Sequence, residues 1–154
     1  MYKKITLTAL LLTLILPAAA FGKGSDKAQR IQWMKEVRNY KYEFFTKEME
    51  LTAEQQEAFF PEYEAMEKAI FTINKEARDL ERKISASTTP VSDTEYEAAA
   101  TAMAKVRQEE GEIEMEYFAK FGKILSKKQL FLLKRAENKF TQSILNHHKR
   151  AGRE

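Results

Sequence analysis

The chain has 154 residues, of which 32% are charged, five are glycine, three are proline and none is cysteine. This composition disfavours a β-sandwich or barrel, which needs frequent turn residues, and it excludes disulfide scaffolds, cysteine proteases and thiolate metal sites. The formal charge of +3 suggests an anionic partner such as nucleic acid, provided that the distribution of the charges supports it.

The first 22 residues are predicted to be a cleaved secretory signal peptide. Two lysines precede an apolar run from Ile5 to Leu16, and a proline and small residues follow. Cleavage after Ala20 and cleavage after Gly22 both fit this pattern. The run is shorter than the roughly 20 residues of a membrane anchor, which is the less favoured alternative. We therefore expect an exported protein that is not embedded in the membrane.

Two helices are predicted in the first half of the mature chain. The first follows a cap at Ser25 or Asp26, and its apolar positions 33, 37, 40 and 44 have helical spacing. The second runs from Thr52 to about Ile84 with a sustained heptad stripe. Pro61 lies inside it and predicts a kink, because proline removes a backbone donor and clashes with the preceding turn.

Two further helices are predicted after a loop at residues 85–91. The third follows Ser92, and Glu110 interrupts its apolar stripe, which predicts an open seam or a basic partner at that place. The fourth follows Ser126, and residues 149–154 are predicted to form a flexible tail. The last three helices each begin with a capping box, in which the cap residue and the residue three positions later satisfy each other's backbone amides.

These elements predict an all-α fold with residues 23–148 as a single domain. The short loop favours a long antiparallel hairpin of the second and third helices, with the first and fourth folded back. Aromatic residues make up 11% of the chain, more than one helical seam needs. The surplus aromatic side chains either form a second packing face within the fold or are covered by a second subunit or a ligand, and we favour a homodimer.

The charges are unevenly distributed along the chain. The net charge is +4 over residues 23–47, −5 over 48–83, −6 over 84–118 and +8 over 119–154. Because the leader carries two lysines and no acid, the mature chain has a formal charge of only +1, and nucleic acid is no longer an expected partner. The pattern fits either pairing of the ends with the middle, within or between subunits, or a basic surface that attracts acidic or unfolded chains.

No constellation typical of an enzyme is present in the sequence. The chain has no glycine-rich phosphate loop and no Glu-x-x-His pair of the kind found in di-iron bundles. Its only histidines, His147 and His148, are adjacent and would point about 100° apart on a helix. We expect no enzyme activity, no cofactor and no metal centre, with these two histidines as weak candidates for a peripheral metal site.

One motif occurs twice, with an offset of 74 residues, at the starts of the second and fourth helices. The matching residues are Leu51, Thr52 and Gln55, then Leu125, Ser126 and Gln129. With this repeat, the exported and cysteine-free chain resembles the Spy/CpxP family of periplasmic proteins, whose hallmark is a repeated LTxxQ motif. The second copy departs from the pattern by having serine in place of threonine.

The resemblance implies a cradle-shaped, four-helix homodimer in which the motif residues fix the corners. It also implies ATP-independent chaperoning of unfolded envelope proteins on a basic and apolar face. The alternatives are a regulatory adaptor that inhibits a membrane stress sensor, and a metal-responsive protein, which the lack of histidine-rich segments disfavours. The candidate client contacts are Arg38, Phe45, Phe60, Phe71, Phe131 and Lys134.

Overall fold

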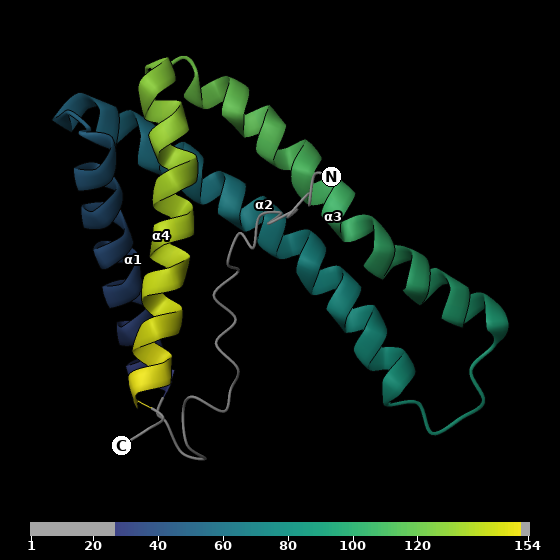
Figure 1. Cartoon of the computed structure of the whole chain (residues 1–154). Coiled ribbons are helices and arrows are strands. Elements are labelled where there is room, and N and C mark those ends of the chain that lie inside the picture. The colour runs from purple at the N-terminus through teal and green to yellow at the C-terminus, as the bar shows by residue number, and fades with distance from the viewer. Residues whose placement is uncertain (1–26, 152–154) are drawn as a thin grey trace, which may run out of the picture. The chain divides into compact units, whose positions relative to one another are not determined.

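The structure is a computed structural model that describes residues 27–151, with side chains described as far as Ile144. The predicted signal peptide and the predicted caps Ser25 and Asp26 lie outside the described residues. The described chain contains four helices and no strand, which confirms the all-α prediction (Figure 1). The helices are α1 (Lys27–Met49), α2 (Ala53–Ser85), α3 (Asp93–Phe121) and α4 (Lys127–Ala151).

The three predicted capping boxes are present. At the start of α3, the Glu95 N–H donates to Ser92 Oγ at 3.3 Å, and the Ser92 N–H donates to Glu95 Oε2 at 3.0 Å. The same reciprocal pair of bonds joins Thr52 to Gln55, and Ser126 to Gln129. Capping involves residues three positions apart, so the starts of these helices can be predicted from the sequence alone.

Two helix details differ from the expectation or go beyond it. The helix α4 continues to Ala151, three residues into the segment that we predicted as a tail. The helix α2 continues without a break through Pro61, and the kink predicted there stays a prediction. Among the described helices, none has the length and apolar character that a membrane crossing requires.

The described chain divides into two compact parts. We call residues 27–60 together with 124–151 the end unit, and residues 61–123 the middle unit. The end unit contains α1, the first eight residues of α2 and all of α4, whereas the middle unit contains the rest of α2 and all of α3. Each unit is described by itself, and the single domain predicted for residues 23–148 stays a prediction.

The core of the end unit is built from aromatic side chains of all three helical segments. Phe45 and Phe59 are 1% and 0% exposed, and the Phe45 ring meets the Phe140 ring edge-on at 6.1 Å. Tyr42 stacks on Phe60 with the ring centroids 4.0 Å apart. These contacts hold α1 between α4 on one side and the beginning of α2 on the other.

This two-sided packing corrects the predicted apolar face of α1. Tyr40 and Phe44 of the predicted stripe do contact Phe140, at 5.8 and 6.0 Å, but Tyr40 remains 45% exposed. The buried positions of α1 are instead Lys41, Phe45 and Met49. The most buried residues of α1 lie between α4 and the beginning of α2. They are therefore displaced around the helix from the predicted stripe, which faces α4 only.

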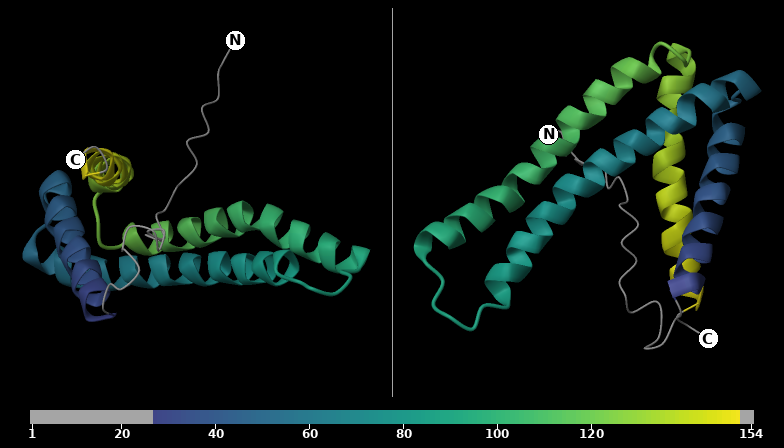
Figure 2. Two further views of the ribbon diagram at one scale, coloured as in Figure 1. Left: turned by 90° about the horizontal axis from the view of Figure 1, so that it is seen from below. Right: turned by 180° about the vertical axis from the view of Figure 1, so that it is seen from behind.

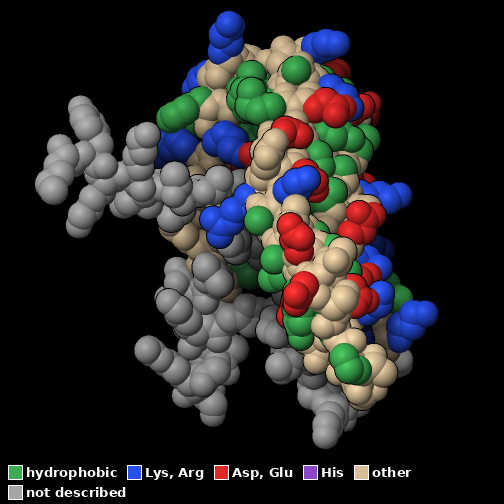
Figure 3. Space-filling model, turned by 90° about the vertical axis from the view of Figure 1, so that its right-hand side faces the viewer, with side chains coloured by type: hydrophobic (Ala, Val, Ile, Leu, Met, Phe, Trp, Pro, Cys, Tyr) green, Lys and Arg blue, Asp and Glu red, His purple; other side chains and the backbone are tan. Residues whose placement is uncertain are grey.

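The middle unit buries the α2 stripe more completely than the α3 stripe. In α2, the predicted positions Tyr63, Met66, Ile70 and Ala77 are buried, whereas Tyr96 and Met103 of the α3 stripe are 54% and 52% exposed. Figure 3 shows hydrophobic side chains at the surface between acidic and basic ones. In the first half of the α3 stripe, Ala99 is 6% exposed, so the uncovered side chains are the large ones, Tyr96 and Met103.

Three contacts join α2 to α3 within the middle unit. Tyr63 lies 6.1 Å from Phe121 between ring centroids, Lys120 lies 4.0 Å from Glu62, and Asn74 Nδ2 donates to Glu110 Oε1 at 2.5 Å. They pair the start of α2 with the end of α3 and the two middles with each other, as Figure 2 also shows. The bond to Glu110 thus comes from the side-chain amide of Asn74, and not from a basic side chain, which was one of the two possibilities predicted for this position.

Candidate functional site

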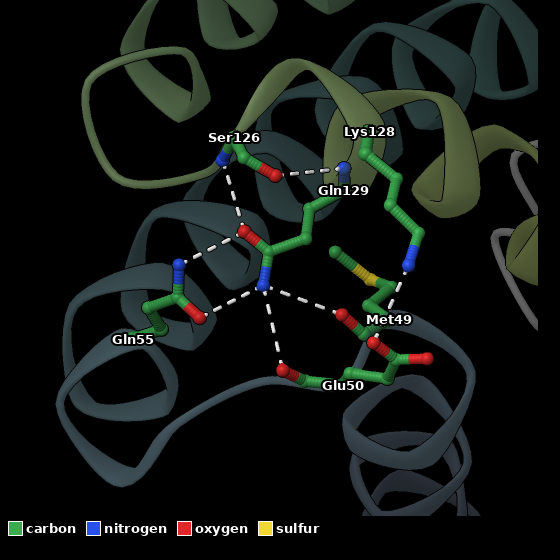
Figure 4. A network of polar contacts seen from close by, with 6 residues as sticks. All are labelled: Met49, Glu50, Gln55, Ser126, Lys128 and Gln129. Carbon is green, nitrogen blue, oxygen red and sulfur yellow. Dashed lines mark hydrogen bonds and ion pairs between the residues drawn. The ribbon is translucent and has the colours of Figure 1, made fainter.

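The two copies of the repeated motif meet in the end unit. Gln55 Nε2 donates to Gln129 Oε1 at 2.9 Å, and Gln129 Nε2 donates to Gln55 Oε1 at 2.9 Å (Figure 4). The two side chains therefore form a reciprocal amide pair across 74 residues of sequence. The sequence offset between the motif copies thus corresponds to a direct contact, which we call the glutamine pair.

Each glutamine of the pair also holds two backbone segments. Gln55 Oε1 accepts from the Thr52 N–H at 3.2 Å, and Gln55 Nε2 donates to the Ile124 carbonyl at 3.1 Å. In the same way, Gln129 Oε1 accepts from the Ser126 N–H at 2.9 Å, and Gln129 Nε2 donates to the Met49 carbonyl at 3.3 Å. Each side chain thus ties the start of its own helix to the chain entering the other motif.

The motif leucines and the end of α1 complete this corner. Leu51 and Leu125 are 8% and 5% exposed, so both belong to the core. Glu50 ends α1 with a φ of 55°, and the Leu51 N–H bonds back to the Thr46 carbonyl at 3.0 Å. Lys128 also forms an exposed ion pair with Glu50 at 3.4 Å. The motif residues therefore bond together the chain segments that meet at this corner.

The structure separates the four aromatic candidates for client contact into an exposed pair and a buried pair. Phe71 and Phe131 are 43% and 63% exposed. The Arg78 guanidinium lies 6.0 Å from the centre of the Phe71 ring, and the Arg135 guanidinium lies 6.0 Å from that of Phe131. Each of the two exposed rings thus has an arginine over it. This arrangement combines apolar surface with positive charge.

Phe45 and Phe60 are the other aromatic candidates, and their burial corrects that prediction. They are 1% and 8% exposed, because Phe45 packs on Phe140 and Phe60 stacks on Tyr42. Both are core residues of the end unit and do not contribute to its surface. Their positions off the predicted stripes reflect the second packing side of α1.

The two basic candidates both lie in the end unit. Arg38 is exposed on α1, and Lys134 lies three residues after Phe131 on α4. Lys134 also pairs with Glu137 at 2.7 Å. The structure therefore places Lys134 on the same helix as Phe131, whereas Phe71 belongs to the middle unit.

Sequence reasoning missed Lys41, which is only 7% exposed. Its ammonium group lies 5.6 Å from the centre of the Phe140 ring, so a positive charge sits inside the aromatic cluster of the end unit. The available signal was its spacing, since Lys41 precedes Phe45 by four residues and Met49 by eight. Lysine is seldom assigned to a buried position because its charge favours water.

Some charged groups on the surface have shifted pKa values. Hydrogen bonds from the Ser92 backbone and hydroxyl lower the pKa of Glu95 below its ordinary value. The Lys75 ammonium lowers the pKa of Asp79, and Glu116 raises the pKa of Lys120. These shifts favour the charged forms, and they arise from a helix cap and from ion pairs within the helices.

Within residues 27–144, no three histidine or acidic side chains come together in a way that could hold a metal ion. His147 and His148 lie in the α4 backbone, and their side chains are beyond the described ones. Comparisons of the chain with protein-family models, with curated proteins and with solved structures found no match. The functional argument is therefore made from the corner, the exposed arginine–aromatic pairs and the charge distribution.

Proposed function

We propose that the mature protein is an ATP-independent periplasmic chaperone that holds unfolded or misfolded envelope proteins. The observation that carries the proposal is the exposure of Phe71 and Phe131, each with an arginine over its ring. Covering a large exposed aromatic side chain with a client removes apolar surface from water, which stabilises the complex. The neighbouring cation adds attraction for acidic clients and keeps the uncovered surface hydrated.

The charge distribution supports the same proposal. Over residues 27–60 and 124–144, the end unit has eleven basic and seven acidic side chains, whereas the middle unit has nine and fourteen. An excess of positive charge attracts acidic chains over distances longer than an apolar contact. Capture would then have two stages, electrostatic approach followed by apolar contact.

A homodimer with a long central hairpin and folded-back flanking helices is part of this proposal. The resemblance to the Spy/CpxP family supports it, as do the antiparallel contacts of α2 with α3 and the exposed Tyr96 and Met103 on the α3 stripe. A second subunit that covers these two side chains would bury apolar surface that the single chain leaves in water.

The test is an aggregation assay with an unfolded client at low salt and near-stoichiometric chaperone. We expect the mature protein to suppress aggregation, and the double variant Phe71→Ala/Phe131→Ala to need several-fold more protein for the same effect. The control is Met115→Ala, because Met115 is 68% exposed but has no arginine–aromatic pair. If the unaltered protein leaves aggregation unchanged, the chaperone proposal is wrong.

The division of charge between the units also suits a second function, a regulatory adaptor that binds the periplasmic part of a membrane stress sensor. Such an adaptor needs one complementary surface on one partner. A pull-down from envelope extract distinguishes the two functions, because an adaptor recovers one membrane protein whereas a chaperone recovers many denatured proteins.

A further inference from the structure

The first half of α1 arranges its side chains in three sectors around the helix. At about 100° per residue, Trp33, Val37 and Tyr40 point in one direction, toward the side on which Tyr40 contacts Phe140. A second sector holds uncharged polar residues and the only acid of this segment, Glu36, which accepts from Gln32 Nε2 at 2.8 Å. The third sector combines cations with apolar side chains.

We call this third sector the cationic–apolar face of α1. It spans an arc of roughly 140° on the helix, and the exposed fractions of Ile31 and Met34 within it are 53% and 55%. The cations of the face are exposed as well. Its members are Lys27, Arg30, Ile31, Met34, Lys35 and Arg38.

The same side of α1 is buried further along the helix. Its continuation one to three turns later is formed by Lys41, Phe45 and Met49, which are 7%, 1% and 0% exposed. There, the beginning of α2 and α4 cover it, as the Tyr42–Phe60 and Phe45–Phe140 contacts show. The cationic–apolar face therefore lies on the same side of α1 as the buried residues that follow it, but it is exposed. A partner segment can pack against it there.

We infer that the cationic–apolar face of α1 is a binding site for polypeptide segments in which acidic residues alternate with apolar ones. The inference rests on the proposed chaperone function and names the class of client segment that this site prefers. Four cations with two apolar side chains between them match carboxylates interleaved with apolar residues. Glu36, the only acid in the first half of α1, lies on another sector and does not oppose such a segment.

The order of charges within the face favours a polypeptide over an anionic lipid surface. Viewed down the helix axis with Lys27 placed at 0°, Arg38 lies at about 20°. Ile31 lies at about 40° and Met34 at about 340°, so the two cations lie between these two apolar side chains. Insertion of both apolar side chains into a bilayer would draw these cations toward the acyl chains, whereas lipid-binding helices keep cations beside the apolar stripe. A peptide carboxylate can instead lie directly over them.

The site is tested with three fluorescently labelled 14-residue peptides and the full mature protein. The first peptide repeats a heptad of glutamate and leucine, the second has lysine in place of every glutamate, and the third keeps the glutamates but has serine in place of every leucine. We expect the first to bind at least tenfold more tightly than the others, because only it supplies both charge and apolar contact. Fluorescence anisotropy at low salt measures the three affinities.

Two matched double variants assign the binding to α1. We expect Arg30→Glu/Lys35→Glu to weaken binding of the glutamate–leucine peptide about tenfold. The control Lys105→Glu/Arg107→Glu also replaces two cations by glutamates, at exposed positions of α3, so it changes the net charge by the same amount. It should change the affinity less than twofold. Glutamate, the new residue at all four positions, is a good helix former, and circular dichroism checks that the helical content is kept.

The inference is overturned if the two variants weaken binding equally, or if the lysine–leucine peptide binds as tightly as the glutamate–leucine peptide. Stronger binding to phosphatidylcholine vesicles containing phosphatidylglycerol than to the peptide would overturn it in favour of a lipid surface. Each of these results can occur while the protein still suppresses aggregation through Phe71 and Phe131. Loss of aggregation suppression itself is the separate result that rejects the chaperone function.

Discussion

At the scale of single residues, the glutamine pair has the largest expected effect on stability. Gln55→Ala and Gln129→Ala each remove a part-buried side chain that bonds its own helix start, the other glutamine and a distant carbonyl. We expect each to lower the free energy of unfolding by about 2 kcal/mol, since polar groups of the partner segment lose their partners. Urea unfolding measures the change.

The double variant tests whether the two glutamines act as a unit. Once one amide is gone, the other has already lost its reciprocal bonds, so the double variant should cost about 1 kcal/mol less than the sum of the single variants. Gln32→Ala is the control, because Gln32 makes one exposed bond to Glu36, and should cost less than about 0.5 kcal/mol. Additive costs for the glutamine pair would show that the two corners are independent.

Glu50 is a second residue with a predictable effect, of opposite sign. Its φ of 55° is unfavourable for a side chain with a Cβ but costs glycine nothing. Glu50→Gly should therefore raise the free energy of unfolding by about 0.5–1 kcal/mol, although it removes the exposed ion pair with Lys128. Glu50→Ala loses that ion pair and keeps the strain, so thermal unfolding should place it below Glu50→Gly. The reverse order would contradict the argument.

At the scale of an element, the cap of α3 gives a pH-dependent prediction. The pKa of Glu95 is held below its ordinary value by the Ser92 backbone and hydroxyl. Folding therefore gains stability from this group when the pH is above the ordinary glutamate pKa of about 4.3. That gain is lost as the pH falls from there through the lower pKa of the folded state, when the carboxylate is protonated.

Hydrogen exchange at the first amides of α3 measures this effect. The Glu95 and Tyr96 N–H groups bond to the Ser92 carbonyl, so they report the start of the helix. We expect their protection to fall as the pH drops below the ordinary glutamate pKa of about 4.3, after correction for intrinsic exchange. Glu95→Gln should remove this pH dependence while leaving a side chain that can still accept a bond. An unchanged pH profile in that variant would assign the titration to another group.

The helix starts could be predicted from sequence, whereas the depth of burial could not. Thr52, Ser92 and Ser126 each bond within the next three residues, so their pattern is complete in the printed sequence. The burial of Lys41 depends on two other segments that meet α1. Likewise, the α3 stripe has the right spacing, yet Met103 is exposed because spacing alone does not supply a covering helix.

The candidate surface shows the same division between local and long-range information. Phe45 and Phe131 both lie off the predicted stripes, yet one is 1% exposed and the other 63% exposed. The difference is the Phe140 ring against Phe45, a contact across 95 residues that no local pattern contains. The motif repeat marked Gln55 and Gln129 as equivalent positions at two corners, but the sequence did not predict that the two side chains bond to each other.

At the scale of the whole molecule, the uneven charge predicts how client capture depends on salt. The end unit has an excess of cations and the middle unit an excess of acids. Under the proposed chaperone function, an acidic unfolded client is attracted to the end unit before any apolar contact forms. The range of this attraction is set by the Debye length, about 30 Å at 0.01 M salt and about 3 Å at 1 M.

Stopped-flow binding of an acidic unfolded client separates the two stages of capture. We expect the association rate constant to fall at least tenfold between about 0.01 M and 0.5 M salt, because steering is screened. The dissociation rate constant should change much less, because apolar contacts at Phe71 and Phe131 do not depend on screening. A basic client of equal length is the control and should associate more slowly at low salt. If salt acts mainly on dissociation, the charges hold the client instead of attracting it, and the two-stage order is wrong.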